Sequence, residues 1–239
     1  MDIKQYGVSP NMEKIITSAI LIAMMTCGIS NAEKLQFPQG ETLDLSEKVG
    51  VYDAENSFTV KMIRKEIDKK ETQEKIKESL LNSGVTTNVE EATNTVTNII
   101  KNTRIYQLRS NTKENYYQGI LVSVYVKNSD KTKLKQLQEN LAKESENIDL
   151  VGIAVKLYIK NIPLDIKEKD MKKSEKGIEY TEKETKADFE NADYSSDLYT
   201  DTIIIKGKEG STYSVFNTTQ VAAKYFRPFI EQALRGMEK

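Results

Sequence analysis

The sequence predicts an α+β protein, a two-layer sandwich in which amphipathic helices cover a mixed or antiparallel sheet. Residues 120–126 and 151–159 alternate apolar side chains with others, as strands with one buried face do. Between them, Leu134, Leu137 and Leu141 have the spacing of one helical stripe. Near the C terminus, a hairpin pattern precedes an apolar helix. We expect the helices to cover one face of the sheet and water to reach much of the other.

The stretch from 119 to 163 is the centre of this prediction. Asn128, Ser129 and Asp130 follow the first strand, and all three are residue types that cap helices. A helix should therefore begin at Lys131, and Pro163 should end the second strand. If the two strands are parallel neighbours, the crossover between them is right-handed. The sequence leaves open a third strand lying between them.

Composition limits the possible functions. The chain has 239 residues, of which 38% are hydrophobic and 30% are charged, enough to fold as one domain over residues 33–239. Its formal charge of −1 argues against nucleic-acid binding driven by bulk charge. The chain has no histidine, and its single cysteine is Cys27. Ser-His-Asp and Cys-His catalysis are therefore absent, as are imidazole metal sites.

The N terminus resembles a secretory signal peptide over residues 1–32. An apolar run from Ile15 to Ile29 is followed by Ser30 and Ala32, the small residues of a cleavage site. This run is shorter than the ~20 residues that span a bilayer. We therefore expect cleavage after Ala32 and a periplasmic or extracellular protein, from a bacterium by its Lys-, Asn- and Thr-rich composition.

Alternatives for the N terminus remain open. Met12 is a more natural start than Met1, because a short charged stretch then directly precedes the apolar run. Lipidation at Cys27 would make the protein a membrane-anchored lipoprotein, although Thr26 is bulkier than the residue usual before a lipidated cysteine. An uncleaved anchor or a buried helix is the third possibility.

The chain between the N terminus and residue 113 contains both element types. Residues 48–53 and 57–63 are predicted strands joined by a turn, and 64–83 a charge-rich helix that Gly84 ends. Asn88 and Glu91 have the spacing of a capping box before a further helix. Residues 104–109 alternate as a strand.

Residues 167–196 form the most polar segment, and we expect a long, mobile excursion there. Carboxylates are dense at its end, and oxygen ligands at this density are those that Ca²⁺ prefers. Their spacing does not match an EF-hand loop. The weak calcium candidates are Asp188, Glu190, Asp193, Asp197 and Asp201.

The C-terminal region predicts a hairpin of residues 201–206 and 211–216, then a helix. Residues 217–220 again resemble a capping box, and Pro228 should bend the helix. Paired tyrosines at 116 and 117 and aromatic residues of this helix are candidates for a binding surface. The surface would comprise Tyr116, Tyr117, Tyr225, Phe226 and Phe229.

No sequence motif indicates catalysis or a bound cofactor. The chain has neither G-x-x-x-x-G-K-[ST] nor G-x-G-x-x-G. The favoured prediction is an exported, non-enzymatic protein that binds another macromolecule, another envelope or surface protein, or that contributes to a surface assembly. One alternative is a small-ligand carrier with a pocket under the C-terminal helix. Another is a hydrolase that uses carboxylates or a Ser–Lys pair.

Overall fold

The fold is built around one antiparallel sheet. The computed structural model describes residues 30–32, 34–82, 88–113, 115–141, 162–187 and 198–239. All strand pairings in the eight-stranded sheet are antiparallel. In spatial order its strands are β1 (Ser30–Ala32), β4 (Val49–Asp53), β5 (Arg104–Ser110), β6 (Gln118–Lys127), β10 (Gly210–Thr219), β9 (Leu198–Lys206), β8 (Glu179–Ala187) and β7 (Lys172–Lys173).

Helices and a small second sheet complete the described part. A two-stranded sheet pairs β2 (Leu35–Gln36) with β3 (Thr42–Leu43). The α-helices are α2 (Phe58–Ile67), α3 (Lys70–Asn82), α4 (Val89–Asn102), α5 (Lys131–Leu141) and α7 (Gln220–Arg235). Two short 3-10 helices are η1 (Asn128–Asp130) and η3 (Glu168–Asp170).

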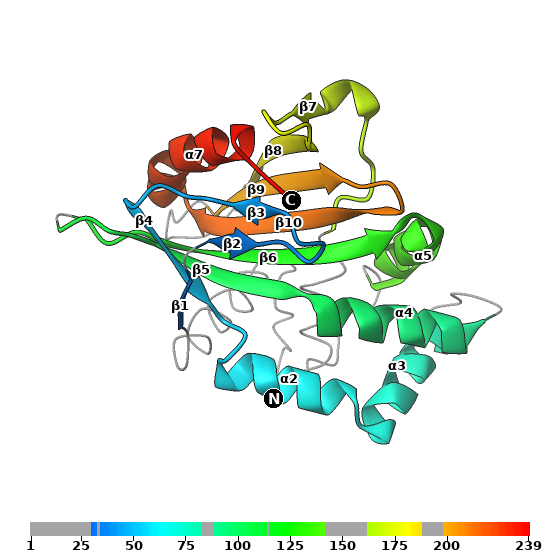
Figure 1. The fold of residues 1–239 in the computed structure, drawn as a ribbon. Helices are drawn as coiled ribbons and strands as arrows, with labels where there is room; N and C mark the ends of the chain where they lie inside the picture. The colour runs from blue at the N-terminus through cyan, green and yellow to red at the C-terminus, as the bar shows by residue number, and fades with distance from the viewer. Residues whose placement is uncertain (1–29, 33, 83–87, 114, 142–161, 188–197) are drawn as a thin grey trace, which may run out of the picture.

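Helices lie on both faces of the large sheet (Figure 1). One hydrophobic cluster joins α2, α3, α4 and α5 to one face, and another joins α7 and the β2–β3 hairpin to the opposite face. The α+β class, the antiparallel sheet under amphipathic helices and the C-terminal hairpin followed by a helix are thus confirmed. The face that we expected water to reach is covered as well.

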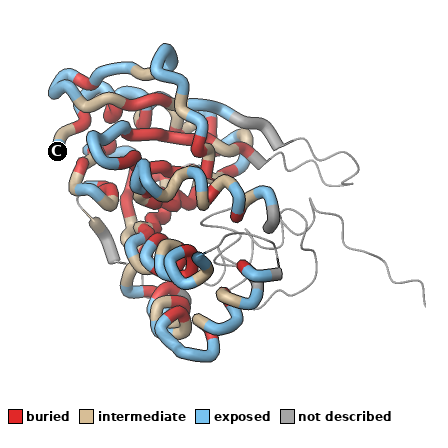
Figure 2. Tube along the Cα trace, turned by 90° about the vertical axis from the view of Figure 1, so that its right-hand side faces the viewer, coloured by how far each residue is buried: buried red, intermediate tan, exposed pale blue. Residues whose placement is uncertain are grey.

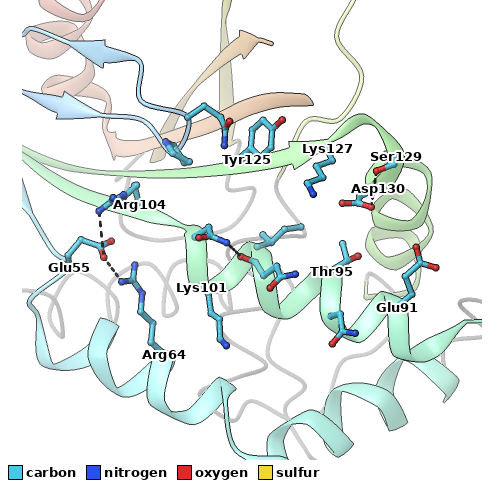
Figure 3. Close-up of a pocket in the computed structure, with 16 residues that line it drawn as sticks. Glu55, Arg64, Glu91, Thr95, Lys101, Arg104, Tyr125, Lys127, Ser129 and Asp130 are labelled. Carbon is cyan, nitrogen blue, oxygen red and sulfur yellow. Dashed lines mark hydrogen bonds and ion pairs between the residues drawn. The ribbon is translucent and has the colours of Figure 1, made fainter. Parts of the chain in front are cut away.

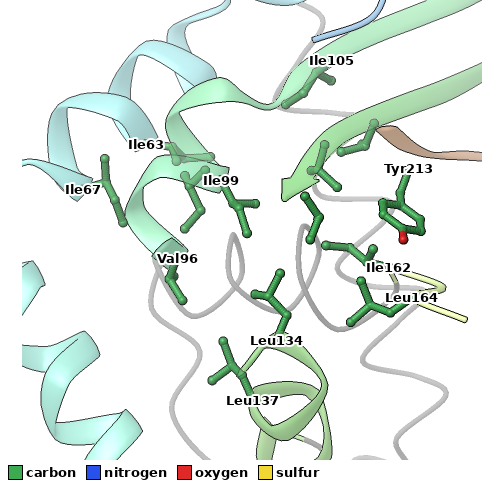
Figure 4. Close-up of a cluster of buried hydrophobic side chains, with 14 of the residues drawn as sticks. Ile63, Ile67, Val96, Ile99, Ile105, Leu134, Leu137, Ile162, Leu164 and Tyr213 are labelled. Atoms are coloured by element: carbon green, nitrogen blue, oxygen red, sulfur yellow. The ribbon is translucent and has the colours of Figure 1, made fainter. Parts of the chain in front are cut away.

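The first cluster confirms the alternation read from β6. Val122, Val124 and Val126 point into it together with Ile120, whereas Leu121 belongs to the opposite cluster. Leu134 of α5 is 1% exposed and packs within the same cluster (Figure 4). Burying such an aliphatic side chain stabilises the fold by about 1.5–3 kcal/mol. The strand predicted at 151–159 lies outside the described residues.

The second cluster attaches α7 to the sheet. Phe226 is fully buried, and its ring meets Phe216 of β10 edge-to-face at 5.5 Å. Ile230 and Leu234 continue the buried stripe along the helix. Figure 2 shows buried residues along the strands and on the sides of the helices that face them.

The prediction of a strand at 57–63 is wrong, because these residues belong to α2. The Ser57 hydroxyl accepts a hydrogen bond from the Val60 backbone N–H at 3.2 Å, as an N-cap does. Val60, Ile63 and Ile67 then form a buried stripe at helical spacing. The helix predicted at 64–83 is accordingly two helices, since α2 ends at Ile67 and α3 begins at Lys70.

Capping was predicted correctly at α4 and two residues early at α7. Asn88 accepts a hydrogen bond from the Glu91 backbone N–H at 3.1 Å. At α7, Thr219 is the N-cap and accepts from the Ala222 N–H. Asn217 instead lies within β10, opposite Ile120 of β6.

Part of the predicted excursion at 167–196 is sheet. Strand β8 pairs with β9 along its whole length, and β7 pairs with β8. Strand β8 is held by backbone hydrogen bonds, which its polar sequence does not reveal. Among its described side chains, only Tyr180 and Thr181 are buried, so no apolar alternation marked it as a strand. Residues 188–197 lie outside the described ranges, as do residues 1–29 of the predicted signal peptide.

Candidate functional site

An aromatic surface lies where α7 passes the start of β6. Val221, Tyr225 and Phe229 follow one another at four-residue spacing on α7, and Tyr116 and Tyr117 directly precede β6. We call these five residues the aromatic surface. Tyr116 is 66% exposed and Val221 60% exposed, while the other three are partly buried.

The rings of the aromatic surface are held in place by one another. The Tyr225 ring lies 5.1 Å from that of Tyr117 and 5.3 Å from that of Phe229, centroid to centroid. The Tyr225 hydroxyl donates to the backbone carbonyl of Lys48 at 2.7 Å, which ties α7 to the start of β4. The structure therefore brings together four of the five residues predicted for a binding surface. The fifth, Phe226, belongs to the core.

The side of α7 that faces the sheet is filled. Phe226, Ile230 and Leu234 are each no more than 2% exposed and pack within the second cluster. The helix thus presents close-packed side chains to the sheet where a carrier would need a cavity.

A charged cluster joins α7 to strands β8 and β9, which lie beyond β10 in the sheet. Arg227 lies between Glu184 of β8 and Asp201 of β9, with 2.8 Å between its Nη2 and Asp201 Oδ1. Burial opposes the charge of Arg227, but the hydrogen bonds to both carboxylates outweigh it and raise its pKa. Burial also raises the pKa of Asp201 against the opposite effect of Arg227. The cluster fixes α7 over β8 and β9.

The fold shifts the pKa of the Glu182 carboxyl group toward neutral pH. Burial raises its pKa to about 7, and the negative charges of Asp201 and Glu231 add to this effect. Glu182 can therefore hold or release a proton near neutral pH. The neighbouring Asp201 carboxylate accepts a hydrogen bond from Arg227.

The predicted calcium ligands do not form a site among the described residues. Asp188, Glu190, Asp193 and Asp197 lie outside the described ranges, and Asp201 is an ion-pair partner within β9. Within the residues that the structure describes, no group of three or more His, Cys, Asp or Glu could hold a metal ion.

A polar groove, which sequence reasoning missed, lies between α4 and the end of β6 (Figure 3). Its volume is about 710 Å³, within the range of small-ligand pockets. Residues of α4, the ends of β5 and β6, η1 and the β2–β3 turn line it. Those used below are Glu55, Arg64, Asn94, Asn98, Arg104 and Lys127.

The groove's lining leaves a signal in the sequence only on α4. Asn94, Asn98 and Asn102 recur at four-residue spacing, which places three amides on one side of a helix. The basic residues of the groove come from four separate elements, α2, α4, β5 and β6. Only the tertiary fold assembles them.

Fold and surface together define an α+β protein with an antiparallel sheet, an aromatic surface at one end of β6 and a polar groove at the other. Comparison of the chain with protein-family models, with curated proteins and with solved structures found no match. Within the described ranges, no helix combines the length and apolarity needed to cross a membrane.

Proposed function

We propose that this is an exported, non-enzymatic protein of the bacterial envelope or surface that binds another protein through the aromatic surface. The observation that carries the proposal is the exposure of Tyr116 and Val221 beside the partly exposed rings of Tyr117, Tyr225 and Phe229. Aromatic residues are enriched at protein interfaces and supply large contact areas with few rotatable bonds.

The packing of the rings supports binding further. Tyr225 contacts Tyr117, Phe226 and Phe229, so its ring is already ordered before a partner arrives. Side chains that are ordered in advance lose less conformational entropy on association. The tyrosine hydroxyls also tolerate both water and a buried interface.

Export is supported by the N-terminal pattern of the sequence. The apolar run of Ile15–Ile29 and the small residues Ser30 and Ala32 have the order of a signal peptide. An envelope location would place the aromatic surface where other exported proteins are available as partners.

Site-specific photocrosslinking in intact envelopes tests the proposal. A photoreactive phenylalanine analogue is placed at Tyr116 in one variant and at Val221 in another. The matched control carries it at Phe58 of α2, which is 70% exposed but remote in sequence and on the other side of the sheet. We expect one protein adduct of the same mass from positions 116 and 221, and none from 58.

Two outcomes would overturn the proposal. Adducts to lipid alone would identify the aromatic surface as membrane-binding. Equal adducts from position 58 would show that exposure, rather than this surface, determines capture. As a second readout, Tyr225→Ala should reduce the adduct yield at 116, since it removes the ring that orders Tyr117.

A further inference from the structure

We propose that the polar groove binds an extended, acidic peptide segment that adds as a strand to the edge of β6 beyond Ser123, where no described strand pairs with it. This site is separate from the aromatic surface, because the groove lies at the Lys127 end of β6 and the aromatic surface at the Gln118 end. The inference therefore stands or fails independently of the proposed function.

The first step is that β6 extends further than its neighbour. Pairing with β5 ends where Arg104 lies opposite Ser123, but β6 continues to Lys127. On the other side, β10 pairs with β6 over its full remaining length, up to Gly210 opposite Lys127. Residues 124–127 therefore have a described strand on one side only. An open strand edge presents unpaired N–H and C=O groups, to which an extended peptide can pair.

The second step is that the open edge borders the groove rather than packed side chains. Tyr125 and Lys127 of β6 line the groove, as do Asn94 and Asn98 of α4. Figure 3 shows α4 facing the end of β6 across the groove. At about 3.3 Å per residue, the open edge is on the order of 13 Å long, the length of a short peptide segment. A peptide lying there would have a strand on one side and a helix on the other.

The third step is charge. Arg64 and Arg104 share one carboxylate, Glu55, at 2.5 and 3.9 Å. Among the described residues, the Arg64 Nε and the Glu55 Oε1 are buried without a hydrogen-bond partner. Lys127 is exposed and forms no ion pair within the described part of the chain. Arg64 is occupied by Glu55 and the Thr103 carbonyl. Arg104, however, approaches Glu55 only at 3.9 Å and keeps donors for a second carboxylate, which an acidic ligand would supply.

The fourth step is the amide stripe on α4. In the described structure, the side chains of Asn94 and Asn98 form no hydrogen bond with protein groups, and both line the groove. Each amide offers a donor and an acceptor. They are suited to the polar side chains of a bound peptide, and they would disfavour an apolar one.

Panning the full-length protein against a phage-displayed library of random peptides tests the inference. We expect enrichment of peptides that carry Asp or Glu. A synthetic version of an enriched peptide should bind the Lys127→Gln variant about 5-fold more weakly, because one charge contact is worth about 1 kcal/mol. Lys224→Gln on α7 is the matched control, since Lys224 is also exposed but lies outside the groove. It should bind the peptide as the unchanged protein does.

Methylation of alternate backbone nitrogens of that peptide tests the strand pairing itself. We expect binding to be lost in one of the two methylation registers, because a strand edge accepts only one set of N–H groups. Binding that tolerates both registers, or that free glutamate or phosphate abolishes at equal concentration, would reduce the site to an anion site and overturn the inference. Absence of any enriched acidic sequence, or equal binding by Lys127→Gln and the unchanged protein, would do so as well.

Discussion

At the residue scale, Glu182 shows how neighbouring elements change the pKa of one side chain. Asp201 of β9 and Glu231 of α7 add negative charge around it, and Arg227 of α7 and Lys172 of β7 oppose them. Burial has the largest effect and raises the pKa of Glu182 from 4.5 to about 7. The folded protein thus binds this proton more tightly than the unfolded chain does.

This shift predicts a pH-dependent effect of Glu182→Gln. The stabilising contribution of the proton is complete below the unfolded pKa of 4.5 and is lost as the pH rises through about 7. Glutamine mimics the protonated form, so the variant should match the unchanged protein at acid pH. Above neutrality it should be more stable by roughly 1–3 kcal/mol, as the size of the pKa shift implies. Urea unfolding at several pH values measures the difference.

The control for this prediction is Glu78→Gln, which changes a solvent-exposed glutamate on α3. Its effect on the free energy of unfolding should not change sign or grow across the same pH range. A Glu182→Gln variant that is less stable than the unchanged protein at alkaline pH would mean that the carboxylate is stabilised by charge there, contrary to the expectation.

At the element scale, α2 shows how a local pattern was misinterpreted. Phe58, Val60 and Met62 alternate as in a strand, but Val60, Ile63 and Ile67 also have helical spacing. The side chain of Ser57 favours the helix by accepting the Val60 N–H, and Phe58 is then left exposed. Short apolar stretches satisfy both periods, so the surrounding packing determines the element that forms.

Ser57→Ala tests the role of this cap. Loss of an N-cap hydroxyl costs about 1 kcal/mol of stability, and Ser57 is fully buried, so no water replaces the hydroxyl. We expect a lower urea midpoint with an unchanged slope. Ser129→Ala, at an exposed position in η1, serves as the control and should leave the midpoint unchanged. Equal midpoints for Ser57→Ala and the unchanged protein would indicate that packing alone maintains α2.

At the scale of the whole molecule, the position of β1 bears on the predicted processing. Ser30, Asn31 and Ala32 pair with Asp53, Tyr52 and Val51 of β4. Cleavage after Ala32 would remove this strand and expose the β4 edge of the sheet. The predicted cleavage would therefore remove the same residues that pair with β4 in the fold.

Mass spectrometry of the exported protein shows whether the mature chain keeps β1. We expect the mature chain to begin at Glu33, because the small residues Ser30 and Ala32 follow the apolar run. Retention of an intact N terminus at Met1 or Met12 would contradict the export prediction. A lipid-modified N terminus at Cys27 would instead support the lipoprotein alternative, in which β1 is kept.

Much of the fold was predictable because its signals are local. The alternation in β6, the stripe of Leu134 and Leu137, and the cap at Asn88 each involve residues a few positions apart. The rest depends on segments distant in sequence. Arg227 meets Asp201 only because α7 folds back over the sheet, and the groove exists only because β6 extends beyond β5.

The sequence by itself determined the α+β class, the C-terminal hairpin and helix, and which side chains of β6 share a face, because periodicity and capping act within one or two turns. The tertiary structure alone decided that both faces of the sheet are covered, that polar residues 179–187 form a strand, and that Phe226 is core while Tyr225 stays partly exposed. The physical reason is that backbone pairing and side-chain burial depend on neighbours that the linear order of residues does not specify.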